Sequence, residues 1–227
     1  MRGEIGIVPS GIIFDWDNTL VDSWSVIGDA LNATFRDLDY PEWTPAEVKA
    51  KVRHSLRDSF PRMFGPRWEE ARGLYLKHFE EVHIARLKVL DGAAELVEAL
   101  HRTGIYLAIV SNKTGRLLRA EVAALGWNPY FSAIIGAGDA PADKPDPAPV
   151  AQALAPGGIV PSSGIWFVGD TDIDVICAHN ASCTAVLVGS EPVAPEIQAM
   201  GPILTFLNCR TLLDAILPSR SCNTNSL

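Results

Sequence analysis

The sequence predicts an α/β fold, a doubly wound parallel sheet into which a helical segment is inserted. Short apolar runs without polar alternation recur along the chain, which is typical of strands covered on both faces. Amphipathic helical patterns separate these runs, and such alternation of strand and helix favours a parallel sheet. The chain has 227 residues, of which 48% are hydrophobic, so it is long enough for one or two domains with a real core.

Each expected strand is a short apolar run that ends in a polar turn. The strands are expected over residues 11–15, 105–110, 133–135, 165–168 and 184–188. Helical patterns separate these runs, and they predict helices over residues 93–101, 115–125, 148–154 and 172–180.

The interval between the first two strands is far longer than a crossover connection requires. It has a helical pattern from about residue 23 to residue 88, and the breaks are expected at Pro41, Pro45, Pro61 and Pro66. We therefore expect an inserted α-helical cap over 23–88, an α/β catalytic core over 1–22 and 89–217, and a flexible tail over 218–227.

The charge of the chain is unevenly distributed. With 19 basic and 27 acidic residues the net charge is −8, which argues against coating of nucleic acid or of an anionic membrane. Residues 23–88, however, hold 11 basic and 10 acidic residues. These cations either form a solvated helical face or face the carboxyl edge of the sheet, where they would receive an anionic substrate.

Cysteine spacing and hydropathy indicate a reduced, cytoplasmic protein. The four cysteines lack the paired C-x-x-C spacing of a zinc site, and they are Cys177, Cys183, Cys209 and Cys222. No apolar run approaches the ~20 residues that cross a bilayer. Residues 1–10 contain no apolar signal-peptide core.

Small polar, acidic or lysyl side chains follow four of the expected strands. Because ligands of open α/β sheets bind beyond the carboxyl ends of the strands, these side chains are expected to share one site. They are Asp15 and Asp17 after the first strand, Ser111 and Asn112 after the second, Lys144 after the third, and Asp170 and Asp174 after the fourth.

Three of these carboxylates, on Asp15, Asp17 and Asp170, would converge within a few ångströms. Like charges at such distances are costly unless a cation neutralises them. Mg²⁺ is the expected cation, because it prefers oxygen ligands together with water and substrate phosphate. Lys144 adds a fixed positive charge, and Ser111 can bind phosphoryl oxygens, so the pattern is typical of phosphoryl transfer.

The spacing of the acids predicts a division of roles. Asp15 can attack phosphorus and form an aspartyl-phosphate. Asp17 lies two residues further along an extended segment and projects to the same side, so it can act as the general acid and base. Asp170 is then expected to bind the metal.

The motifs resemble those of the haloacid dehalogenase-like (HAD) hydrolase superfamily. The resemblance rests on Asp15-x-Asp17-x-Thr19, on Ser111, on Lys144-Pro145 and on Gly169-Asp170-x-x-x-Asp174, in this order. The insertion point is similar to that of subfamily I, and phosphoglycolate phosphatase-like members are the nearest match. The resemblance covers nearly the whole chain.

The resemblance implies a HAD-type Rossmann-like core and a role for each motif residue. It implies that Asp15 is the nucleophile and a metal ligand, and that Asp17 is the acid/base and binds Mg²⁺ through its backbone carbonyl. Ser111 and Lys144 would hold the phosphoryl group, and Asp174 would be a second acid of the metal site. The chain departs from the family at Trp16, where an aliphatic residue or Phe is usual.

Other residues are less specific. In the expected cap, Arg53, His54 and Arg57 resemble the substrate-facing segment of subfamily I and are candidates for a second anionic group of the substrate. Asn112 and Lys113 either bind phosphate or cap the next helix. Thr19 is expected to fix the local turn. His78, His83, His101 and His179 have no partner pattern, and the tryptophans are interpreted as packing residues.

The expected activity is a Mg²⁺-dependent phosphatase that hydrolyses a small phosphorylated metabolite, similar to phosphoglycolate, as a monomer or homodimer. A phosphomutase of the β-phosphoglucomutase type would use the same site. Three other functions fit the sequence less well. A dehalogenase of the superfamily lacks the second aspartate, which is present here as Asp17, and a receiver domain lacks the helical insertion. A non-enzymatic binding protein does not need the four-part site. Phosphoglycolate, a sugar phosphate, a nucleotide and pyrophosphate all stay open as substrates.

Overall fold

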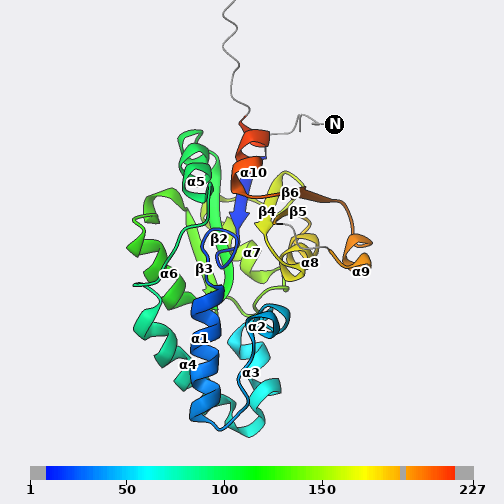
Figure 1. Ribbon diagram of the computed structural model, residues 1–227. Coiled ribbons are helices and arrows are strands. Elements are labelled where there is room, and N and C mark those ends of the chain that lie inside the picture. The colour runs from blue at the N-terminus through cyan, green and yellow to red at the C-terminus, as the bar shows by residue number, and fades with distance from the viewer. Residues whose placement is uncertain (1–8, 190–192, 218–227) are drawn as a thin grey trace, which may run out of the picture.

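The protein forms a six-stranded parallel sheet with helices on both faces (Figure 1). The computed structural model describes residues 9–189 and 193–217, so the expected tail and Cys222 lie outside the described residues. The strands lie in the order β3-β2-β1-β4-β5-β6. Every neighbouring pair is parallel, which confirms the predicted doubly wound sheet.

The strands agree with the sequence pattern except at three places. Their bounds are β1 Gly11–Phe14, β2 Tyr106–Thr114, β3 Ala133–Ala137, β4 Ile165–Gly169, β5 Thr184–Val188 and β6 Ile203–Phe206. Strand β2 extends four residues beyond the expected 105–110, and β3 extends to Ala137. Strand β6 is absent from the predicted strands; it is a four-residue edge strand whose residues are partly exposed.

Helices cover both faces of the sheet. On one face lie α5 (Ala93–Arg102), α6 (Gly115–Ala124) and α10 (Cys209–Ile216), and on the other lie α7 (Ala148–Leu154) and α8 (Asp172–Asn180). The short helix α9 spans Pro195–Gln198. Strand β1 shows why the runs lack alternation: Ile12 and Phe14 pack in one apolar cluster and Ile13 in the other, all fully buried. Both faces are therefore core.

Four helices follow β1 and pack around an apolar cluster of their own. They are α1 (Trp24–Asp37), α2 (Pro45–Lys51), α3 (Leu56–Phe64) and α4 (Trp68–Val82), which lie beyond the carboxyl ends of the strands in Figure 1. Pro45 is the first residue of α2, and Thr44 and Glu47 form a capping box at the start of this helix. The break predicted at Pro61 is wrong, because α3 runs through it and buries Phe60 and Phe64.

The described ranges contain no helix with the length and apolar character that crossing a membrane requires.

Candidate active site

A cavity lies between the carboxyl edge of the sheet and the four helices. It is lined by the predicted residues Asp15, Asp17, Ser111, Asn112, Lys144 and Asp170, and by Arg53 and His54 from the segment between α2 and α3. Strands β2, β1 and β4 are neighbours in the sheet, so residues that follow them in sequence meet at one edge. The structure thus brings the predicted strand-end residues together.

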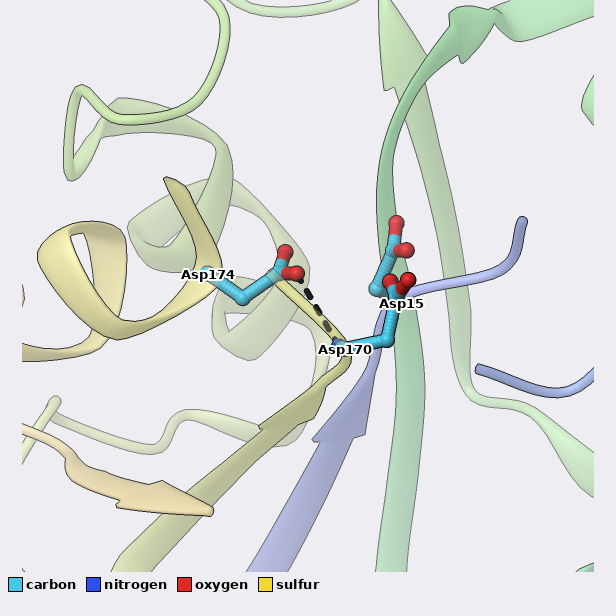
Figure 2. A group of neighbouring side chains, drawn as sticks. All are labelled: Asp15, Asp170 and Asp174. Atoms are coloured by element: carbon cyan, nitrogen blue, oxygen red, sulfur yellow. Dashed lines mark hydrogen bonds between the residues drawn. The ribbon is translucent and has the colours of Figure 1, made fainter. Parts of the chain in front are cut away.

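Three carboxylates gather beside this cavity, and two of them, Asp15 and Asp170, line it (Figure 2). Asp15 follows β1, Asp170 follows β4 and Asp174 lies on α8; one oxygen of each lies within 4.8 Å of the others. Burial raises the pKa of Asp15 from its ordinary value of 3.8 to about 6. Burial, followed by the charges of Asp174 and Asp15, also raises the pKa of Asp170. The three acids therefore need a compensating positive charge.

Lys144 supplies part of that charge. Its ammonium donates to Asp15 Oδ1 at 2.6 Å and to Asp174 Oδ1 at 2.7 Å. Burial alone would lower the pKa of a lysine, but the two carboxylates outweigh burial and raise the pKa of Lys144. The lysine is therefore a fixed cation that orients the Asp15 carboxylate.

Asp174 is tied to the turn between β4 and α8. Its Oδ2 accepts from the backbone N–H of Asp170 at 3.2 Å, and from the backbone N–H and hydroxyl of Thr171 at 3.0 and 2.8 Å. Gly169 is required here, because a Cβ at this position would lie 2.3 Å from the Cβ of Asp174. Asp174 is thus saturated with protein donors, which fits an indirect role at a metal site.

Thr19 does more than fix a turn. Its buried hydroxyl lies 3.3 Å from Asp170 Oδ1 and 3.5 Å from Asp15 Oδ2, and thereby links the ends of β1 and β4. The turn itself depends on Asn18, which has a φ of 65° and accepts from the backbone N–H of Ser23 at 3.2 Å. Asparagine tolerates this left-handed conformation better than most residues do.

Ser111 and Asn112 lie in the extended end of β2. The backbone N–H of Lys113 donates to the Ser111 hydroxyl at 3.2 Å. Asn112 Nδ2 donates to the backbone carbonyl of Lys144 at 3.1 Å, while Oδ1 is buried and has no partner among the described residues. Thr114, not Asn112 or Lys113, is the N-cap of α6, so the helix-capping interpretation of these two residues is wrong.

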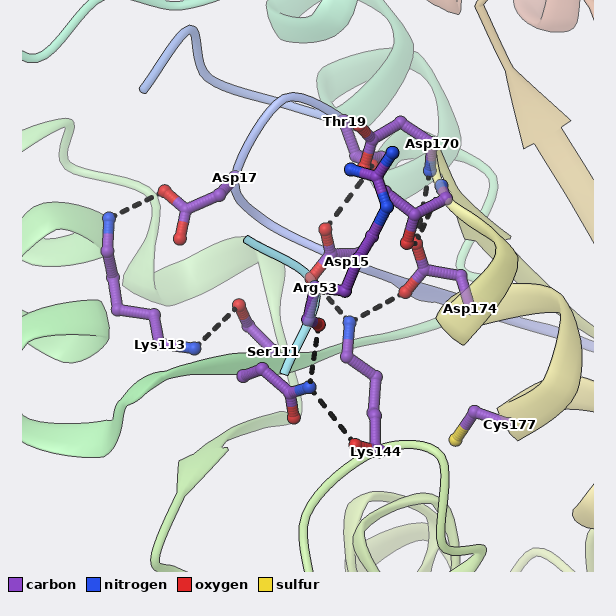
Figure 3. A network of polar contacts seen from close by, with 12 residues as sticks. Asp15, Asp17, Thr19, Arg53, Ser111, Lys113, Lys144, Asp170, Asp174 and Cys177 are labelled. Carbon is purple, nitrogen blue, oxygen red and sulfur yellow. Dashed lines mark hydrogen bonds and ion pairs between the residues drawn. The ribbon is translucent and has the colours of Figure 1, made fainter. Parts of the chain in front are cut away.

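Asp17 is not part of the carboxylate cluster, which contains Asp174 in its place, so the predicted convergence of Asp15, Asp17 and Asp170 is corrected. Its Oδ1 accepts from Lys113 Nζ at 2.6 Å, and in Figure 3 its carboxylate points toward Lys113 and away from Lys144. Lys113 in turn contacts the buried Glu121, which sequence reasoning did not single out. No motif marks Glu121, since it occupies an ordinary helical position in α6.

The three cationic candidates between α2 and α4 differ in position. Arg53 and His54 line the cavity, and Arg53 Nε lies 3.6 Å from Asp172 Oδ1. Arg57 does not line it; its guanidinium pairs with Asp143 at 2.7 Å. Substrate binding by Arg53 and His54 therefore fits the geometry, whereas Arg57 is occupied elsewhere.

The family model described as haloacid dehalogenase-like hydrolase matches residues 12–188. This range includes every element that contributes to the acid cluster. The chain belongs to the haloacid dehalogenase-like hydrolase family. The predicted resemblance to subfamily I phosphoglycolate phosphatase-like members is likewise confirmed.

Named relatives and a solved structure agree with this assignment. The chain is 31% identical over 217 residues to a phosphoglycolate phosphatase of Caulobacter vibrioides, covering 89% of this chain and 91% of that protein. It is 28% identical over 178 residues to pyrophosphatase PpaX of Halalkalibacterium halodurans, covering 78% and 82%. A HAD-superfamily hydrolase of Ehrlichia chaffeensis is 30% identical, with a TM-score of 0.63 over 92% of this chain and 97% of that chain.

Proposed function

We propose that this HAD-like hydrolase is a Mg²⁺-dependent phosphatase that hydrolyses a small, phosphoglycolate-like phosphomonoester. The observation that carries the proposal is Lys144, whose ammonium binds Asp15 and Asp174 in a cavity that Asp170 also lines. A fixed cation beside an acid cluster suits a phosphoryl group, whose charge needs several positive partners. The phosphoglycolate phosphatase and pyrophosphatase names of the relatives support the class of substrate.

The proposed reaction has two steps. In the first, a carboxylate oxygen of Asp15 attacks phosphorus, the bond between phosphorus and the ester oxygen breaks, and Asp17 gives its proton to the leaving alcohol. In the second, water attacks the aspartyl-phosphate, Asp17 takes the proton of that water, and inorganic phosphate leaves Asp15. Ser111, Asn112 and Lys144 are placed to hold the phosphoryl oxygens.

The donor set of the site fits a magnesium ion. Asp15, Asp170 and Asp174 present carboxylate oxygens within 4.8 Å of one another, and burial raises the pKa of Asp15 and Asp170, so their ionised forms need a cation in addition to Lys144. Asp15, Asp170 and the backbone carbonyl of Asp17 would hold the ion, with Asp174 behind them. When bound, Mg²⁺ would offset the charge of the carboxylates and of the phosphoryl oxygens.

The test is phosphate release from 4-nitrophenyl phosphate and from a panel of phosphorylated metabolites that includes phosphoglycolate and pyrophosphate. We expect Asp15→Asn and EDTA each to abolish release, and Mg²⁺ to restore it after EDTA. Asp29→Asn, a matched change at an exposed residue paired with Arg86, should leave activity intact. Undiminished phosphate release by Asp15→Asn would contradict the assignment of Asp15 as the nucleophile.

The same panel distinguishes the phosphomutase. Interconversion of hexose phosphates with a bisphosphate primer and with little release of inorganic phosphate would replace the phosphatase proposal. The cytoplasmic location and the monomeric or homodimeric state stay predictions.

A further inference from the structure

A second cluster of buried polar side chains lies beside the acid cluster. Its centre is Glu121 of α6, which is 1% exposed. Glu121 Oε1 is bonded to His83 Nδ1 at 2.8 Å, and Oε2 accepts from Trp16 Nε1 at 2.6 Å and from Lys113 Nζ at 2.7 Å. Three segments that are distant in the sequence thus meet on one carboxylate.

Lys113 connects this cluster to the proposed acid/base. Its ammonium lies between two carboxylates, 2.6 Å from Asp17 Oδ1 and 2.7 Å from Glu121 Oε2. It also lies over the ring of Phe79 on α4, 4.9 Å from the ring centre. Only 5% of the Lys113 side chain is exposed, so few alternative positions are open to its ammonium.

The Asp17 segment is therefore held from two sides. Trp16, the neighbour of Asp17 in the chain, is fully buried and bonded to Glu121 through its indole N–H, while Lys113 holds the Asp17 carboxylate itself. Figure 3 shows this carboxylate directed at Lys113. Buried ion pairs add little to stability compared with well-packed apolar residues, and one role they can have instead is to fix geometry.

We propose that Lys113 is a positioning residue for Asp17, and that Glu121, held by Trp16 and His83, fixes Lys113 in place. The proposal rests on the proposed function, in which Asp17 transfers the proton to the leaving alcohol. Misplacement of a reacting group by about 1 Å can cost about 10²-fold in rate. Loss of Lys113 should therefore impair proton transfer while leaving the nucleophile Asp15 and the phosphoryl site intact.

Two esters separate this role from a general structural one. Ethyl phosphate releases a basic alkoxide that needs a proton, whereas 4-nitrophenyl phosphate releases a stable phenolate that does not. For Lys113→Met we expect the single-turnover rate of Asp15 phosphorylation to fall about 10²-fold with ethyl phosphate and by less than about threefold with 4-nitrophenyl phosphate. Hydrolysis of the aspartyl-phosphate, in which Asp17 also takes part, should slow by the same factor with both esters. Glu121→Gln should show the same selectivity more weakly, and Lys113→Arg should restore much of the loss.

The control is Arg119→Met, which removes a cation of α6 that pairs with Asp139 outside the cavity. This variant should leave the rates with both esters unchanged. If Lys113→Met does not fold, the double variant Lys113→Met/Glu121→Gln removes both charges together and is assayed in its place. Equal losses in the rate of Asp15 phosphorylation with both esters, or no loss with either, overturn the proposal.

Crystal structures of the wild type and the variant give a second readout that needs no activity. The Asp17 carboxylate should leave its position in Lys113→Met, and an unmoved carboxylate overturns the positioning role. Wild-type protein that releases phosphate from neither ester would overturn the proposed function instead, so the two failures are distinguishable.

Discussion

The ammonium of Lys144 lies 2.6 Å from Asp15 Oδ1, although 129 residues separate the two in the sequence. Asp15 follows the central strand β1, and Lys144 reaches it from the loop after the edge strand β3. The pair is almost fully buried, with 4% of the Lys144 side chain and 8% of the Asp15 side chain exposed. Its charges therefore affect stability as well as chemistry.

Removal of this lysine should destabilise the protein. Lys144→Met leaves Asp15 and Asp174 buried without their cation, and breaking a buried ion pair in this way costs about 3–5 kcal/mol. We expect the free energy of unfolding in EDTA at pH 7 to fall by about this amount, as measured by urea denaturation. Lys51→Met, which breaks an exposed pair with Glu47, should lower the free energy of unfolding far less. Equal midpoints for the two variants would contradict the role of Lys144 as a buried counter-charge.

Asp17→Asn should slow turnover without removing the nucleophile. General acid–base catalysis contributes about 10²–10⁴ in rate, so kcat on an alkyl phosphate should fall by that factor. The variant should still transfer phosphate to Asp15 from 4-nitrophenyl phosphate, because this step needs no acid, and it should then retain the phosphate longer than the wild type does. Mass spectrometry of acid-quenched protein measures the phosphoprotein. If Asp17→Asn hydrolyses the alkyl phosphate at the wild-type rate, the general acid and base must be another group.

Stability without metal should fall as pH rises. Since the folded-state pKa of Asp15 is raised from 3.8 to about 6, the folded protein holds more protons than the unfolded chain between these values. The contribution of Asp15 to the free energy of unfolding is fully present below pH 3.8 and is lost as the pH rises through about 6. The raised pKa of Asp170 acts in the same direction.

Mg²⁺ should reverse this trend, because it binds the ionised carboxylates and competes with protons. We expect the rise in Tm caused by Mg²⁺ to be larger at pH 7.5 than at pH 5. Asp15→Asn, which removes one titrating ligand, should reduce that difference. A Tm increase that is independent of pH between these values would show that Mg²⁺ does not compete with protons for the acid cluster.

The two neighbouring arginines of the α2–α3 region should differ in their effect on substrate binding. Arg53 lines the cavity, whereas Arg57 pairs with Asp143 outside it. For a substrate with a second anionic group, Arg53→Ala should raise KM about tenfold or more, by loss of a charge-assisted contact, and should leave kcat little changed. Arg57→Ala is the matched control and should leave KM within about twofold. A larger rise in KM for Arg57→Ala than for Arg53→Ala would indicate that the substrate binds beside Arg57 instead of in the cavity.

The sheet and the strand-end residues could be predicted because each depends on local pattern. Continuous apolar runs identified β1, β4 and β5, and the rule that ligands bind at the carboxyl edge placed Asp15, Ser111 and Asp170 together. Lys144 could be included because the third strand was recognised before it. Predictions of this kind need only the direction of each strand and the order of the motifs.

The rest depends on contacts that leave no local pattern. The sequence pattern predicts a packing role for Trp16 and no partner for His83, yet both bind Glu121. Only the packing of α6 against α4 and the end of β1 creates this cluster. Strand β6 is also missing from the prediction, although its four residues are mostly apolar; it lies at the edge of the sheet and is partly exposed.

Leu117 of α6 packs into the apolar cluster of α1–α4, next to the cavity that it also lines. His83, which follows the last residue of α4, also contacts α6, because it is bonded to Glu121. The helical insertion and the sheet are therefore not independent building blocks. Replacing the four helices by a short linker would leave Leu117 in water and deprive Glu121 of one bonding partner, so a minimal version of this enzyme would need new residues on α6 as well.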